Sequence, residues 1–233
     1  MSRQIAWGRV LVEGAVIVSS ILLAFGIDAT WAERGERRTE REELQRVYDE
    51  LVLEHDRIRE FEAEWSWRAE AAQDFVNRVE ALGGRSGTIQ VPDSVLETFF
   101  GSRRFAPLTP ALDGLLDSGN YQVVRDPGVR SAIASLEREF EYLDGVQSGA
   151  SDFMRNQLLP AFVGRGDMSR VLLYSRDRRQ ELGGGATPVR VDSDISALAA
   201  YRSTQCRGVS GGLERARAAV DSVLDAIDAA RAD

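Results

Sequence analysis

The sequence predicts an all-α protein in which an N-terminal transmembrane helix continues into an extramembrane helical bundle. Three observations predict this class: an apolar run at residues 10–30, apolar residues at three- to four-residue spacing after it, and scarce strand signals. We therefore divide the 233 residues into a tail at 1–9, an anchor at 10–31 and a helical domain at 32–233.

The apolar run is long enough for a membrane anchor. It holds 21 residues, with Glu13 and Asp28 as its only charges, and about 20 residues cross a bilayer core as a helix. A secretory signal peptide is the rival interpretation, but its apolar region is shorter and ends in a small-x-small cleavage site. Here the helical pattern continues through "GIDATWAERGERR", which favours an uncleaved anchor. Trp7 and Trp31 lie about 36 Å apart along a helix, so we expect them, with Asp28, at the two membrane interfaces.

Small residues follow one face of the predicted anchor. At about 100° per residue, four of them fall within roughly 40° of one another. They are Gly8, Ala15, Ser19 and Gly26. Because small residues let another membrane helix approach closely, they predict a helix-packing interface; the alternative is that small residues are simply common in membrane helices. Glu13 and Ser20 lie near the opposite face, where we expect a polar contact within the membrane, or a Glu13 side chain that reaches the headgroups.

The predicted domain begins with a long helix at 33–82. This stretch has no proline, its apolar residues recur at helical spacing, and "GGRSG" at 83–87 ends it. Short helices are expected between 91 and 182. Their segments are 91–101, 109–119, 125–146, 151–162 and 169–182. Thr109 and Asp126 each precede a proline and are predicted N-caps.

A C-terminal helical region spans 192–231. Gly208, Gly211 and Gly212 lie within it and either break the helix or allow close packing. Strand signals occur only in "TIQV" at 88–91 and "TPVRV" at 187–191, which can pair as a short hairpin. These elements favour an up-and-down helical bundle.

Composition excludes several classes of function. The net charge of −8 is unsuited to nucleic acid or to anionic lipid surfaces. One cysteine, Cys206, and one histidine, His55, exclude an internal disulfide and zinc sites with several His or Cys ligands. The anchor has no histidine to ligate a haem or chlorophyll. We expect no catalytic, cofactor-binding or metal site, and no enzymatic activity.

Two segments carry recognisable patterns of residues. The first has an apolar run, then Ile-Asp, Trp-x-Glu-Arg and a charged helix, with Ile27, Asp28, Trp31, Glu33 and 51–56 as its members. The second is a Leu-x-x-Ser-Gly segment with Val and Asp, whose members are Leu115, Ser118, Gly119, Val124 and Asp126. Together the two segments resemble a family of uncharacterised bacterial single-pass membrane proteins. Ser20 replaces the usual glycine, and Trp31 is slightly shifted.

The resemblance implies the bacterial inner membrane, because members of this family have basic N-terminal tails that stay in the cytoplasm. It therefore favours a periplasmic domain. Counting arginines alone points the other way, since residues 34–46 hold more of them than the tail. The family has no established activity to transfer.

The predicted function is that of a non-catalytic accessory subunit. Its anchor would pack on other membrane helices in the lipid bilayer, and its domain would hold partner subunits. The architecture suggests an energy-transducing host, such as a photosynthetic reaction-centre or light-harvesting assembly. The alternative is an extracytoplasmic sensor that binds a small ligand and signals through its anchor with a partner protein.

Overall fold

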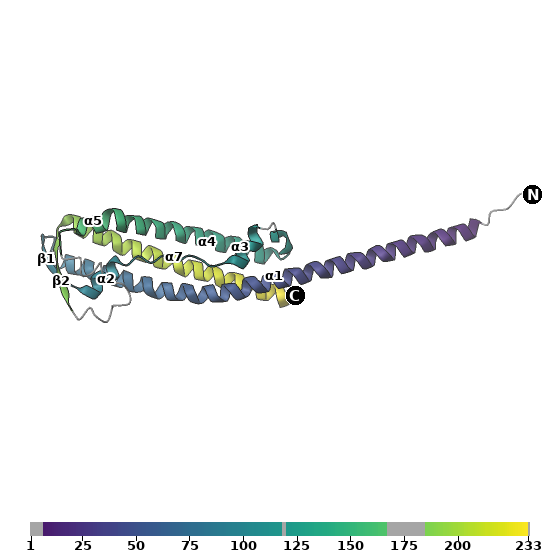
Figure 1. Cartoon of the computed structure of the whole chain (residues 1–233), viewed down its shortest axis with the longest axis horizontal. Coiled ribbons are helices and arrows are strands. Elements are labelled where there is room, and N and C mark those ends of the chain that lie inside the picture. The colour runs from purple at the N-terminus through teal and green to yellow at the C-terminus, as the bar shows by residue number, and fades with distance from the viewer. Residues whose placement is uncertain (1–6, 118–119, 167–184, 233) are drawn as a thin grey trace, which may run out of the picture.

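A computed structural model describes residues 7–117, 120–166 and 185–232, which form a three-helix bundle with a small sheet at one end (Figure 1). Helix α1 (Trp7–Glu80) runs through 74 residues without interruption. Its first part extends beyond the bundle (Figure 1), and we call residues 7–35, which precede the Glu36–Arg125 ion pair, the stalk. The predicted helical bundle is confirmed, and one continuous helix joins it to the stalk.

Helix α7 (Ser193–Ala232) lies against both α1 and α4 (Pro127–Phe153). Its glycines do not break it. A Cβ atom on Gly212 would come within 3.1 Å of the Leu143 side chain on α4, so this glycine allows close packing. Of the two predicted alternatives for the glycines, close packing is the one observed.

An irregular segment, residues 101–109, runs along the bundle and contacts both α1 and α4, and we call it the strap (Figure 1). The Phe105 ring lies 5.3 Å from Phe61 of α1 and 6.3 Å from Phe140 of α4. The Gln147 side chain donates to the Phe105 carbonyl at 3.1 Å and accepts from its N–H at 2.7 Å. Side chains thus pair the backbone groups that no helix or strand satisfies.

Two short helices flank the strap: α2 (Asp93–Phe100) and α3 (Pro110–Asp117). Thr109 precedes α3, as predicted, but a distant residue supplies the cap. The Glu50 carboxylate on α1 accepts hydrogen bonds from the N–H groups of Ala111 at 2.7 Å and Leu112 at 3.1 Å. The first turn of α3 is therefore fixed to α1. A short 3₁₀ turn, η1 (Asn120–Val123), leads on to α4.

The carboxylate of Asp126 caps α4 by accepting from two N–H groups of its first turn, as predicted. The prediction of separate helices at 125–146 and 151–162 was wrong, because α4 continues to Phe153. A π-helical turn, η2 (Met154–Leu158), then leads into α5 (Leu159–Phe162). Pro160 has no N–H for the preceding turn, so the hydrogen-bond pattern changes there and not at Gly145 or Gly149, which lie within α4.

Strands β1 (Gly87–Pro92) and β2 (Ala186–Val191) pair antiparallel, with Ile89 opposite Val189, as predicted. Gly83 and Gly84 have positive φ angles of 61° and 77°, a conformation that suits glycine and ends α1. The predicted helix at 169–182 lies outside the described residues.

Candidate functional site

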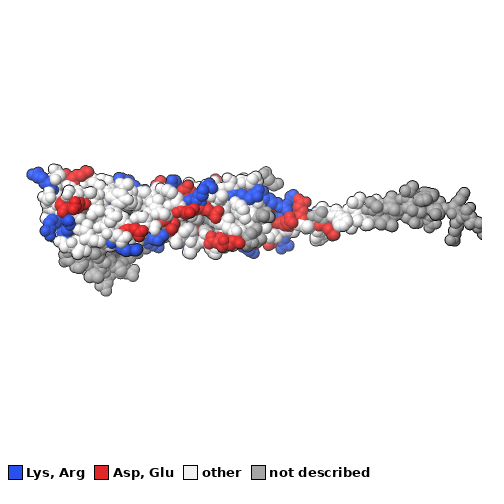
Figure 2. Space-filling model, turned by 90° about the horizontal axis from the view of Figure 1, so that it is seen from above, with Lys and Arg blue, Asp and Glu red and all other residues white. Residues whose placement is uncertain are grey.

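The stalk exposes large apolar side chains around its circumference. Successive residues of a helix point about 100° apart, and Ile21, Leu22 and Leu23 are 49%, 65% and 67% exposed. Figure 2 shows white surface on the stalk beside the charged end of the bundle. Nothing in the described ranges packs over these side chains, so this surface is available to lipid or to another protein.

The stripe of small residues is described in part. Ser19 is exposed, and a Cβ atom on Gly26 would meet no atom within 4 Å. Gly8 and Ala15 lie in α1, but their side chains are outside the described part. This end of the stripe is therefore accessible to a second helix, and the predicted interface stays a prediction.

The predicted membrane-interface residues lie along the same stalk. Trp31 is 69% exposed, and Asp28 and Ser20 are exposed. Trp7 and Glu13 are in α1, but their side chains are not described.

Among the residues that the structure describes, no helix combines the length and hydropathy needed to span a bilayer. Side chains 7–18, which include the first part of the apolar run, lie outside that description.

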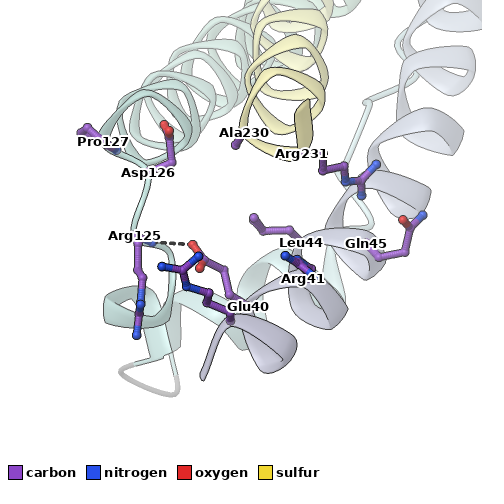
Figure 3. Close-up of a pocket in the computed structure, with 10 residues that line it drawn as sticks. Glu40, Arg41, Leu44, Gln45, Arg125, Asp126, Pro127, Ala230 and Arg231 are labelled. Atoms are coloured by element: carbon purple, nitrogen blue, oxygen red, sulfur yellow. Dashed lines mark hydrogen bonds between the residues drawn. The ribbon is translucent and has the colours of Figure 1, made fainter. Parts of the chain in front are cut away.

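A pocket of about 820 Å³ lies where the stalk meets the bundle, and we call it the neck pocket (Figure 3). Its walls come from α1, from the start of α4 and from the last turn of α7. The charged residues of these walls are Arg37, Glu40, Arg41, Arg125, Asp126 and Arg231. Leu44 and Ala230 add apolar surface. Sequence reasoning missed this pocket, since its walls meet only in the folded chain.

The two carboxylates of the neck pocket are occupied by backbone N–H groups. Glu40 accepts from the N–H of Arg125 at 2.6 Å, and Asp126 caps α4. Arg41, in contrast, has no ion pair or hydrogen bond with any described residue. Three of the four guanidinium groups pair with carboxylates outside the walls, so Arg41 is the one that has donors available for an anion among the described residues. Guanidinium stays protonated at neutral pH, so these groups favour binding over acid–base catalysis.

A second polar cluster is buried beneath the strap. Arg202 of α7, 0% exposed, donates to the carbonyls of Phe99 at 3.0 Å and Gly101 at 2.5 Å. These bonds close the C-terminal end of α2. The Arg202 guanidinium lies over the Trp65 ring, as does that of Arg68. Burial lowers the pKa of Arg202. We assign this cluster to the stability of the strap.

The single cysteine and histidine have structural surroundings. Cys206 is buried, and burial raises the pKa of its thiol, which disfavours the reactive thiolate. His55 of α1 has its Nε2 3.4 Å from a carboxylate oxygen of Asp221 on α7. Within the described ranges, no group of three or more His, Cys, Asp or Glu side chains is placed to hold a metal ion.

Comparisons with family models, with curated proteins and with solved structures found no match. The resemblance drawn from residues 27–56 and 115–126 therefore stays a prediction.

Proposed function

We propose that this chain is a non-catalytic, membrane-anchored accessory subunit that stabilises a larger membrane protein complex. The stalk carries this proposal, because it holds apolar side chains away from the bundle at 49–69% exposure. An exposed apolar surface of this kind marks a membrane or protein interaction site. A bilayer and partner helices together would cover it on all sides.

The continuity of α1 supports a positioning role. Helix runs from Trp7 to Glu80, with exposed ion pairs such as Arg37–Glu33 and Arg38–Glu42 along the junction. A stiff helix holds the bundle at a set distance from the membrane, where it can contact neighbouring subunits. We place the anchor in a bacterial inner membrane and the bundle in the periplasm. The host we propose is an energy-transducing assembly.

Membrane extraction tests the anchor. Leu22→Arg with Phe25→Arg puts two charges on the stalk, and each charge costs about 2.5–3.5 kcal/mol at the centre of a membrane helix. We expect the full chain to stay in membranes through alkaline carbonate washing and the double variant to be released. The control, Val52→Arg with Leu53→Arg, alters exposed apolar residues on the bundle part of α1. Release of the unaltered chain would contradict the anchor.

Co-purification tests the accessory role. Gly26→Leu and Ser19→Leu enlarge the small-residue stripe, and Ala24→Leu enlarges the opposite face as a matched control. We expect the first two variants to lose partner subunits from mild-detergent extracts while all three stay membrane-bound. Mass spectrometry of the purified complex identifies the host. A chain that purifies only as a free monomer would rule out the accessory role.

A further inference from the structure

We propose that the neck pocket binds the phosphate group of an anionic phospholipid and thereby holds the bundle against the membrane surface. This inference rests on the proposed function, which sets where the membrane lies. The pocket is at the end of the bundle from which the stalk leaves, so it adjoins the membrane side of the domain (Figures 1 and 3).

The position of the pocket suits the headgroup layer. Arg37 and Arg41 follow Trp31 by about 9 and 15 Å along the helix axis. Side chains on a helix tilt toward its N-terminus, which is the membrane end here. Both arginines can therefore extend back toward the phosphates, while Trp31 lies at the interface.

One arginine of the pocket has hydrogen-bond donors without a described partner. Arg41 is without an ion pair in the described part of the chain. The other three arginines pair with acids outside the pocket, and these acids have exposed side chains. The pairs are Arg37–Glu33, Arg125–Glu36 and Arg231–Asp228. Exposed ion pairs contribute little to stability, so a phosphate, which takes bidentate hydrogen bonds from guanidinium, can replace them.

The size of the pocket favours a lipid headgroup over a bare phosphate ion. Its volume of about 820 Å³ is near the upper part of the range for small-molecule sites, about 300–1,000 Å³. Leu44 and Ala230 offer apolar contact beside the charges. The Arg125 side chain extends away from Arg41 (Figure 3), so a headgroup held by both requires Arg125 to turn, and it would then join α1 to the segment that leads into α4.

The proposal differs from general attraction to a charged membrane. The chain has a net charge of −8, and Figure 2 shows acidic and basic residues interspersed over the bundle. Long-range attraction is therefore absent, and binding depends on the few arginines that line the pocket. It should be saturable and sensitive to which arginine is removed.

Native mass spectrometry of the full chain, released from nanodiscs of equal parts phosphatidylcholine and phosphatidylglycerol, tests the proposal. The pocket variant is Arg41→Gln with Arg125→Gln; the Arg125 backbone N–H to Glu40 remains. The control is Arg34→Gln with Arg38→Gln, which removes the same charge from the same region of the chain without touching the pocket. We expect retained phosphatidylglycerol to fall about tenfold in the pocket variant, as for loss of a charge-assisted hydrogen bond, and to be unchanged in the control.

Equal losses in both variants would overturn the pocket, because they would show a diffuse charge effect. A second arm adds inorganic phosphate or glycerol phosphate to the full chain in uncharged detergent and follows the thermal midpoint. No increase with either anion, together with retained phosphatidylglycerol, supports the lipid. A rise in the thermal midpoint with either anion that is lost in the pocket variant overturns the lipid in favour of a soluble phosphate. Membrane extraction separately tests the anchor, so failure of the two proposals can be told apart.

Discussion

Helix α1 carries large apolar side chains along both of its parts but buries them in only one. In the bundle part, Leu51, Phe61 and Phe75 are at most 5% exposed, whereas Leu22 and Phe25 on the stalk are 65% and 67% exposed. The patterns differ as well. The bundle part has one apolar stripe, which α7 and the strap cover, whereas residues 21–27 of the stalk are apolar around the circumference of the helix.

This difference shows what each part of α1 requires from its surroundings. A single stripe is satisfied by packing on one side, whereas a helix that is apolar all round needs cover on every side. The described chain supplies the first and not the second. Variants that place the same change in both parts of α1 therefore separate intramolecular packing from interactions with lipid or partners.

Phe75→Ala compared with Phe25→Ala should give the largest effect. Phe75 is 0% exposed and stacks on Phe99 with ring centroids 4.8 Å apart. Truncation of a buried phenylalanine costs about 3–5 kcal/mol through lost burial and the cavity left behind. We expect this loss for Phe75→Ala and almost none for Phe25→Ala, measured by denaturant unfolding of the full chain in non-ionic detergent. Equal losses would mean that the stalk packs on the bundle.

Gln147→Ala should have the next largest effect, because the strap depends on this side chain. Its removal leaves the buried N–H and carbonyl of Phe105 without their side-chain partner. Each buried unsatisfied group costs about 1–3 kcal/mol, so we expect a total loss of at least about 2 kcal/mol in the same unfolding measurement. Gln45→Ala, at an exposed position of α1, is the control. A loss no larger than that of the control would show that water replaces the glutamine.

Helical periodicity was sufficient to predict most of the bundle. The stripe of Leu44, Leu51 and Phe75, and that of Val220 and Ile227, are buried as their spacing predicts. The merged helix at 127–153 could not be predicted in the same way. Gly149 lies between the two predicted helices, but long-range packing of α4 on α7 outweighs the low helix propensity of this residue.

The neck pocket and the buried arginine depend on contacts that sequence spacing does not show. Arg125 and Glu40 are 85 residues apart when they meet at the pocket. Arg202 did leave a signal, because it interrupts the apolar stripe between Ala199 and Cys206 on α7. A charged residue at a core position predicts a buried partner, here the backbone carbonyls at the C-terminal end of α2.

Asp126→Ala should cost about 1 kcal/mol, the usual effect of removing an N-cap. The carboxylate accepts from Gly128 at 2.7 Å and Val129 at 3.0 Å. Glu141→Ala, at an exposed position within α4, should change the free energy of unfolding by a few tenths of a kcal/mol. The cap also adjoins the neck pocket, so Asp126→Asn, which keeps a capping oxygen, separates helix capping from the charge.

Glu54→Gln should have the smallest effect and one that depends on pH. Glu54 lies in the bundle part of α1, 2% exposed, and its Oε2 has no hydrogen-bond partner in the described chain. Burial raises the pKa of this carboxyl, although Arg57 opposes the shift. The folded state therefore binds a proton more tightly than the unfolded state does.

The sign of the pH effect follows from this linkage. A raised pKa gives stability that is fully present below the unfolded value, near 4.5, and is lost as pH rises through the folded value. Asp192, whose pKa the Arg165 ion pair lowers, acts in the opposite direction. The difference in the free energy of unfolding between the unaltered chain and Glu54→Gln therefore isolates the contribution of Glu54. We expect Glu54→Gln to reduce the loss of stability above pH 4.5, measured by unfolding at a series of pH values. Glu60→Gln, at an exposed position of α1, controls for the loss of one charge. Parallel profiles of unfolding free energy against pH for the unaltered chain and Glu54→Gln would mean that water reaches the Glu54 carboxylate.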